Sequence, residues 1–142
     1  MLSVQIGAQQ KIKMLLFSLL LTILRDYGYV RESAENLNRD TLKRISSATE
    51  FINKNLSDNL TLADIAKSAD LAPSYFSAVF KKITGVSPFE YITIKRVEKA
   101  ISLIKNGASS MLSAAEEAGF TSSSNFYKAF FKVTGKTPKD YL

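Results

Sequence analysis

The 142-residue chain contains no cysteine and no histidine. Without cysteine it can form no disulfide, and it has no thiolate to serve as a nucleophile or metal ligand. Without histidine it lacks the commonest general base and the commonest ligand of transition metals. Proline and glycine are also scarce, with three and six residues, and runs of β-branched residues are few. This composition predicts an all-α protein.

The sequence also has no pattern typical of an active site. Glu116, Glu117, Asp58 and Asp64 are isolated acidic residues without an acid or base partner, and no serine has a histidine to activate it. No glycine-rich phosphate-binding loop is present. We therefore predict that the chain is not an enzyme and uses no cofactor or metal. Its net charge of +6 and its pI of about 9.5 favour an acidic partner.

Residues 60–91 have the pattern of a helix-turn-helix. Thr61 can cap a short helix, and Asp70 tolerates the left-handed conformation that a tight turn requires. Pro73 suits the first turn of a second helix because its missing N–H would have no partner there. The apolar face of that second helix carries Phe76, Val79, Phe80 and Ile83. Its outer face carries small, polar and basic side chains: Ser74, Ser77, Ala78, Lys81 and Lys82.

The same pattern occurs a second time, about 50 residues later. The residues of the first copy that recur are Ser74, Phe76, Phe80, Lys82, Thr84, Gly85, Pro88 and Tyr91, which match Ser124, Phe126, Phe130, Lys132, Thr134, Gly135, Pro138 and Tyr141. Before the turn the offset is 49, which pairs Asp70 with Gly119, so the second turn holds one extra residue. Such a repeat indicates that one supersecondary unit is used twice. It predicts helix-turn-helix units at about 60–84 and 111–134, with recognition helices at about 73–83 and 123–133.

The repeated aromatic residues have two interpretations. They could stack on the bases of a single strand, or they could form the core of each unit. Their helical spacing and their recurrence in both copies favour the core. The residues concerned are Phe76, Phe80, Tyr91, Phe126, Phe130 and Tyr141.

A single long helix is predicted between the two copies. Ser87 is a natural N-cap, Pro88 suits the first helical position, and Asn106-Gly107 ends the helix. Its apolar face is predicted to run through Phe89, Thr93, Val97, Ala100, Ile101 and Ile104. About nineteen helical residues span about 28 Å. Since the major groove recurs every 34–36 Å or so on one side of B-DNA, this helix could hold two reading heads about one turn apart.

A strongly apolar segment, residues 11–27, lies near the N-terminus. A signal peptide would need small residues at a cleavage site after the apolar core, but Arg25-Asp26-Tyr27 follows instead. A membrane span needs about 20 apolar residues, and only about 11 are contiguous here. We favour the third interpretation, a helix that packs on the chain's own core or pairs with a second copy in a homodimer.

Two further segments complete the expected organisation. Residues 28–40 are polar and mixed in charge, which is typical of a linker. From Thr41 to about Leu56, apolar residues recur at three- and four-residue steps and predict a helix. We therefore divide the chain into an N-terminal segment, 1–40, and a domain over 41–142.

The motif of each copy is specific. A-x-x-x-D/G-L/F is followed by Y/N-F-x-x-x-F-K/F-K-x-T-G-x-S/T-P-x-x-Y, and Lys95-Arg96-Val97 with Ala100 lies on the helix between the copies. This combination, over about residues 42–142, resembles the AraC/XylS family of bacterial transcription regulators. The resemblance implies a seven-helix, two-lobed domain that places two recognition helices in adjacent major-groove segments. It also implies that residues 11–27 correspond to the end of a preceding sensing or dimerisation domain.

Helix-turn-helix geometry and this resemblance together predict the side chains that touch DNA. The candidates for base readout are Ser74, Ser77, Ala78, Ser123, Ser124, Asn125, Tyr127 and Lys128. The candidates for phosphate contact are Lys81, Lys82, Lys95 and Lys132. The first head departs from the family pattern because Ala72 replaces a capping hydroxyl and Ala78 replaces a long side chain. In the second head Phe131 replaces an expected lysine, and Tyr127 and Lys128 remain the strongest candidates for readout.

The predicted function is sequence-specific binding of double-stranded DNA in transcription regulation. The competing interpretation is a helical module that binds proteins and not DNA. Basic residues of both repeats on one face would favour DNA, and an apolar patch there would favour the protein partner. Together with DNA, the expected partners are RNA polymerase and a second copy held through residues 11–27. The expected location is the bacterial cytoplasm, without membrane association.

Overall fold

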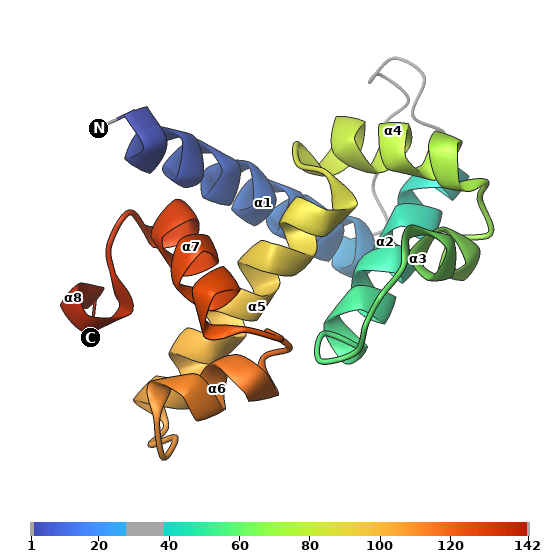
Figure 1. Ribbon diagram of the computed structural model, residues 1–142. Helices are drawn as coiled ribbons and strands as arrows, with labels where there is room; N and C mark the ends of the chain where they lie inside the picture. The colour runs from blue at the N-terminus through green and yellow to red at the C-terminus, as the bar shows by residue number, and fades with distance from the viewer. Residues whose placement is uncertain (1, 28–38, 142) are drawn as a thin grey trace.

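The computed structural model describes residues 2–27 and 39–141, and within these ranges every regular element is a helix (Figure 1). The helices are α1 (Leu2–Tyr27), α2 (Arg39–Lys54), α3 (Leu62–Ser68), α4 (Pro73–Thr84), α5 (Pro88–Lys105), α6 (Met111–Glu117), α7 (Ser123–Thr134) and α8 (Pro138–Tyr141). The all-α class, with two helix-turn-helix units, a long connecting helix and an N-terminal helix, is confirmed. The predicted linker over 28–40 lies outside the described residues except for its last two, which begin α2.

The first unit consists of α2, α3 and α4 around one apolar core. Phe76 and Phe80 of α4 are fully buried in it, and the ring of Tyr91 meets Phe80 edge-on. The predicted cap of α3 is confirmed as a capping box, because the Thr61 hydroxyl accepts from the Asp64 N–H while the Asp64 carboxylate accepts from the Thr61 N–H. Hydrogen bonds from Thr61 lower the pKa of the Asp64 carboxyl.

The second unit, α6, α7 and α8, repeats this arrangement. Phe126 and Phe130 of α7 are fully buried, as Phe76 and Phe80 are in α4. The turn residues that the 49-residue offset pairs, Asp70 and Gly119, both have positive φ, +53° and +103°. The core interpretation of the repeated phenylalanines is therefore confirmed.

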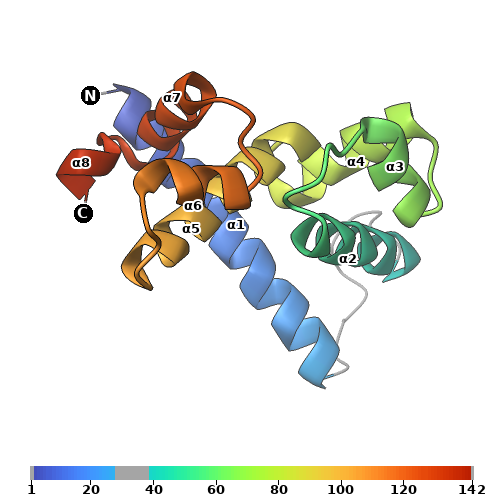
Figure 2. The ribbon, with the colours of Figure 1, turned by 60° about the horizontal axis from the view of Figure 1, so that its bottom comes forward.

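Helix α5 connects the units, and Figure 2 shows it between α2, α3 and α4 on one side and α6, α7 and α8 on the other. The predicted cap at Ser87 and the stop at Asn106-Gly107 are confirmed. The predicted apolar face is wrong at its start, since Phe89 is 52% exposed. The N-terminal half instead buries Tyr91, Ile92 and Ile94. Because α5 packs against neighbours on several sides, it has no single buried face that the spacing of apolar residues could predict.

Helix α1 extends the predicted segment 11–27 back to Leu2 and packs against α7 and α4. Met14 and Phe17 are buried in the core of the first unit. The interpretation of this segment as a helix packed on the chain's own core is therefore confirmed. Within the described ranges no helix is long and apolar enough to span a membrane.

The opposite side of α1 remains apolar and exposed. Its residues, which we call the outer stripe, are Ile12, Leu15, Leu16, Leu19, Leu20 and Ile23, and each is 42–60% exposed. Between Met14 and Leu24 this helix is apolar almost all the way round, and the core of the domain covers one side of it and leaves the other side open.

The two units also meet directly, across the middle of α5. The guanidinium of Arg96 donates from Nε to the Leu56 carbonyl and from Nη2 to the Asp58 carbonyl, both at 2.8 Å. The Ser57 hydroxyl donates to the Glu117 carbonyl at 2.7 Å. We call this set, completed by Gly119, the inter-unit contact. Burial lowers the pKa of Arg96, but guanidinium groups remain charged in proteins.

Candidate nucleic-acid interface

The outer face of α4 is small and basic. Its N-cap, Ala72, makes no side-chain hydrogen bond, as the sequence predicts, and Pro73 supplies the first helical residue. Ser74 and Ala78 are exposed, whereas Ser77 is half-buried. These side chains are short, whereas Tyr75 in the same first turn is large and exposed.

The outer face of α7 is richer in hydrogen-bonding groups. The Ser122 hydroxyl accepts from the Asn125 N–H and is the N-cap, so one hydroxyl of this run is used inside the protein. Ser123, Ser124 and Asn125 are exposed on the first turn that follows. One turn further along α7, Tyr127 and Lys128 are exposed as well. The Tyr127 hydroxyl lies 3.8 Å from the sulfur of Met111. The structure thus brings all five base-readout candidates of this helix onto its N-terminal half.

The four lysines predicted to contact phosphate have different surroundings. Lys81 and Lys82 are exposed in the last turn of α4. Lys95 is half-buried, pairs with Glu98 at 3.0 Å and lies over the ring of Tyr91. It lines the groove between α1 and α2. Lys132 is exposed but pairs with Glu90 at 3.5 Å. Of the four, Lys95 and Lys132 already pair with carboxylates, whereas Lys81 and Lys82 are exposed at the end of α4.

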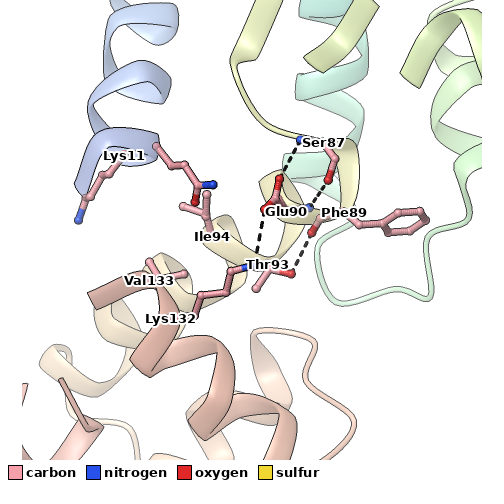
Figure 3. A pocket seen from close by; sticks show the side chains of 9 residues that line it. Lys11, Ser87, Phe89, Glu90, Thr93, Ile94, Lys132 and Val133 are labelled. Carbon is pink, nitrogen blue, oxygen red and sulfur yellow. Dashed lines mark hydrogen bonds and ion pairs between the residues drawn. The ribbon is translucent and has the colours of Figure 1, made fainter. Parts of the chain in front are cut away.

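The ion pair between Lys132 and Glu90 connects α7 to the start of α5 (Figure 3). Burial alone would raise the pKa of the Glu90 carboxyl. Its hydrogen bond from the Ser87 N–H and the charge of Lys132 outweigh that effect and lower the pKa overall. Glu90 thus caps α5 and also pairs with a lysine of the second recognition helix.

Two exposed aromatic residues on the recognition helices are absent from the predicted set. Tyr75 on α4 is 55% exposed, and Phe131 on α7 is 49% exposed. The repeat itself contains the signal for both, because the 50-residue offset pairs Tyr75 with the candidate Asn125 and Phe131 with the candidate Lys81. From the sequence, Phe131 was interpreted only as the replacement of an expected lysine, although a phenylalanine can contact a thymine methyl group.

These features define a class of protein. Two helix-turn-helix units stand on one connecting helix, and each presents a recognition helix with an exposed, polar or basic N-terminal half. A recognition helix of this kind reads base edges in the major groove with its first turns. The fold and the exposed faces are those of a two-headed helix-turn-helix DNA-binding domain.

Comparison with known proteins agrees with this class. Residues 65–142 match the family model described as "Helix-turn-helix domain". The melibiose operon regulatory protein of Escherichia coli K12 is 31% identical over 111 residues, which are 78% of this chain and 37% of that protein. A Streptomyces antibioticus protein described as an AraC-like transcription regulator is 31% identical over 97 residues, 68% of this chain and 32% of that protein.

A solved structure supports the same class of protein. The crystal structure of a DNA-binding transcriptional dual regulator from Escherichia coli K-12 has a TM-score of 0.62 and 26% identity, and the match covers 78% of this chain and 94% of that one. The chain belongs to the AraC-type helix-turn-helix family of transcription regulators, and its domain is a sequence-specific DNA-binding domain. The matched part of the chain spans 37% and 32% of the lengths of these two curated relatives, about a third of each.

Proposed function

We propose that this chain binds one bipartite site on double-stranded DNA, with α4 and α7 in adjacent segments of the major groove. The observation that carries the proposal is the pair of exposed recognition faces on one rigid helix. The 18 residues of α5 correspond to a length of about 27 Å, somewhat less than the 34–36 Å of one helical turn of DNA. Side-chain reach and modest DNA bending would supply the remainder.

The roles within the site follow from exposure and chemistry. We assign base readout in the second head to Ser123, Ser124, Asn125, Tyr127 and Lys128, and in the first head to Ser74, Ser77 and Ala78. Lysine is a donor that suits the acceptors on guanine, whereas an alanine methyl offers only weak apolar contact. We assign phosphate contact first to Lys81 and Lys82. Lys132 and Lys95 would have to exchange a carboxylate partner for phosphate.

A binding titration of three variants tests this assignment. Lys128→Ala should weaken binding to a selected duplex by about 1–3 kcal/mol and relax base preference within one half of the site. Lys82→Ala should weaken all duplexes about equally and make the salt dependence shallower by about one unit of slope. Ser77→Ala should have the smallest effect, because its side chain is short and half-buried.

The measurement uses a duplex selected from a random pool with the unsubstituted chain, and a scrambled duplex as the control, each at several salt concentrations. Should Ser77→Ala lose more discrimination than Lys128→Ala, the first head is the principal reader and the assignment is wrong. Equal binding of the two duplexes by the unsubstituted chain would contradict the proposed function itself.

We also propose that two copies of the chain associate through the outer stripe of α1. Ile12, Leu16, Leu19 and Ile23 recur at steps of four, three and four, the spacing of a coiled-coil seam, and such a seam complements a second copy of itself. Complete burial of these half-exposed stripes in both copies would contribute about 9–18 kcal/mol. Association itself costs about 4–15 kcal/mol, so a dimer of moderate affinity is expected.

Sedimentation of the double variant Leu16→Asp, Leu19→Asp tests the association. The unsubstituted chain should be dimeric at concentrations of tens of micromolar, and the variant should be monomeric because each carboxylate would be desolvated at the seam. Ser18→Asp is the control for an added carboxylate, since it places one negative charge at an exposed position of α1 outside the stripe. Equal masses for the unsubstituted chain and the double variant would contradict the proposal.

The outer stripe also bears on the competing interpretation as a protein-binding module. The stripe lies on α1, whereas the exposed lysines lie on α4 and α7, and we propose that the stripe contacts protein while the recognition helices contact DNA. Binding to RNA polymerase, as a further partner, remains a prediction. We place the protein in the bacterial cytoplasm, where its DNA partner is found, and we assign it no catalytic role.

A further inference from the structure

Helix α1 touches the C-terminal end of both recognition helices. At α4 it lies over Gly85, the C-cap, where a side chain would meet Lys13: a Cβ added there would be 2.9 Å from Lys13 Cδ. At α7, Gln10 and Lys11 of α1 share the lining of a cavity of about 170 Å³ with Lys132 and Val133 (Figure 3). The same helix therefore contacts one end of each reading element.

The buried side of α1 connects the cores of the two units. Met14 and Phe17 are 4% and 5% exposed and belong to the core of the first unit. Val133, from the second recognition helix, packs against this same cluster. Removing either large side chain from α1 would therefore loosen packing between the units as well as within the first one.

The contact through α1 is distinct from the inter-unit contact at Arg96. On α5, Ile94 lies beside α1 in the cavity, whereas Arg96 bonds to the loop of the first unit. Two residues along an α-helix are separated by about 200° around its axis, so these two contacts lie on roughly opposite sides of α5. One contact alone would leave the units free to rock about α5. Contacts on both sides restrict that motion.

We infer that α1 fixes the separation of the two recognition helices and thereby sets the spacing of half-sites that the protein accepts, with Met14 and Phe17 as the positioning residues. This inference rests on the proposed reading of one site by both heads. The recognition faces themselves stay exposed, so α1 restricts geometry without covering the DNA-binding surface. One extra base pair between half-sites moves the second by about 3.4 Å and about 35° around the axis, which rigidly held heads cannot follow.

Distance measurements between the units test the inference without DNA. Because the chain has no cysteine, Lys67→Cys on α3 and Glu116→Cys on α6 provide two exposed sites for spin labels. The unsubstituted α1 should give one narrow distribution of distances. Phe17→Ala and Met14→Ala should each broaden it at least twofold. Ser18→Ala, a truncation at an exposed position of the same helix outside the outer stripe, should leave it unchanged.

Binding to spacing variants tests the consequence for DNA. The probes are the selected duplex and the same duplex with one base pair inserted or removed between the half-sites. The unsubstituted chain should prefer the original spacing by about tenfold or more. Phe17→Ala and Met14→Ala should reduce that preference at least fivefold, while Ser18→Ala should preserve it.

The two experiments separate the possible failures. Distance distributions that stay narrow in both buried variants would overturn the inference, because the inter-unit contact would then be sufficient by itself. An unsubstituted chain that shows no preference among spacings would overturn the proposed two-headed reading, and the distance measurement would still decide what α1 does. If Phe17→Ala unfolds the first unit, the smaller truncation Met14→Ala provides the decisive comparison.

Discussion

Replacing Gly119 by alanine is expected to lower the free energy of unfolding by about 3–5 kcal/mol. Gly119 has φ +103°, where a side chain is strained, and it abuts the loop of the first unit. An added Cβ would lie 2.4 Å from the Leu56 carbonyl oxygen and 2.8 Å from Arg96 Nε. Because backbone atoms cannot rotate out of the way, the two units would have to separate at this point.

Gly107→Ala is the matched control for this substitution. Gly107 has a similar positive φ, +90°, but no heavy atom lies within 4 Å of an added Cβ. Its substitution should therefore add only the left-handed backbone strain, about 1–2 kcal/mol. Urea unfolding of the two variants measures the difference directly. Equal losses would mean that backbone strain alone governs Gly119 and that the close approach to Leu56 has no energetic consequence.

The second large effect is expected at Arg96. Arg96→Met keeps a long apolar side chain but removes the donors to the carbonyls of Leu56 and Asp58. Because Leu56 is buried, water cannot easily replace the hydrogen bond that its carbonyl oxygen would lose. We expect a loss of about 2–4 kcal/mol in the free energy of unfolding, since hydrogen bonds to a charged donor exceed neutral ones. Denaturant titration at pH 7 provides the measurement.

Two comparisons make the Arg96 result interpretable. Lys99→Met removes only a single hydrogen bond, from an ammonium to the exposed Ser57 hydroxyl, and should cost less than about 1 kcal/mol. The double variant of Arg96→Met and Gly119→Ala should lose less than the sum of the single losses, because both act on the Leu56 carbonyl. Strict additivity would show that the two residues do not belong to one contact.

Local chemistry made much of each unit predictable. Thr61, Ser87 and Pro73 act within one helical turn of their own position, so their capping roles depend on a few neighbouring residues only. The left-handed conformation predicted for Asp70 is confirmed, and Gly119, its partner in the repeat, has a positive φ as well. The same local signals identified the N-terminal half of each recognition helix as the exposed surface.

The surroundings of the lysines could not be predicted in the same way. Lys132 has a basic side chain near the second repeat, but its carboxylate partner, Glu90, is set by how α5 and α7 meet. Lys95 instead pairs within its own helix with Glu98, three residues further along. Tyr75 and Phe131 were missed for a related reason, because an aromatic residue on a helix is buried or exposed according to its neighbours. Exposure is a property of the assembled units and not of a residue type.

The sequence by itself determined that residues 11–27 form a helix, because apolar side chains lie almost all the way round it from Met14 to Leu24 and no proline or glycine interrupts it. It could not determine which side is covered, since a helix with no polar face has no orientation of its own. Only the tertiary structure decided that Met14 and Phe17 enter the core while the outer stripe stays exposed. The decision rests on the shape of the surface formed by α4, α5 and α7, and that surface exists only after residues far apart in the chain have packed together.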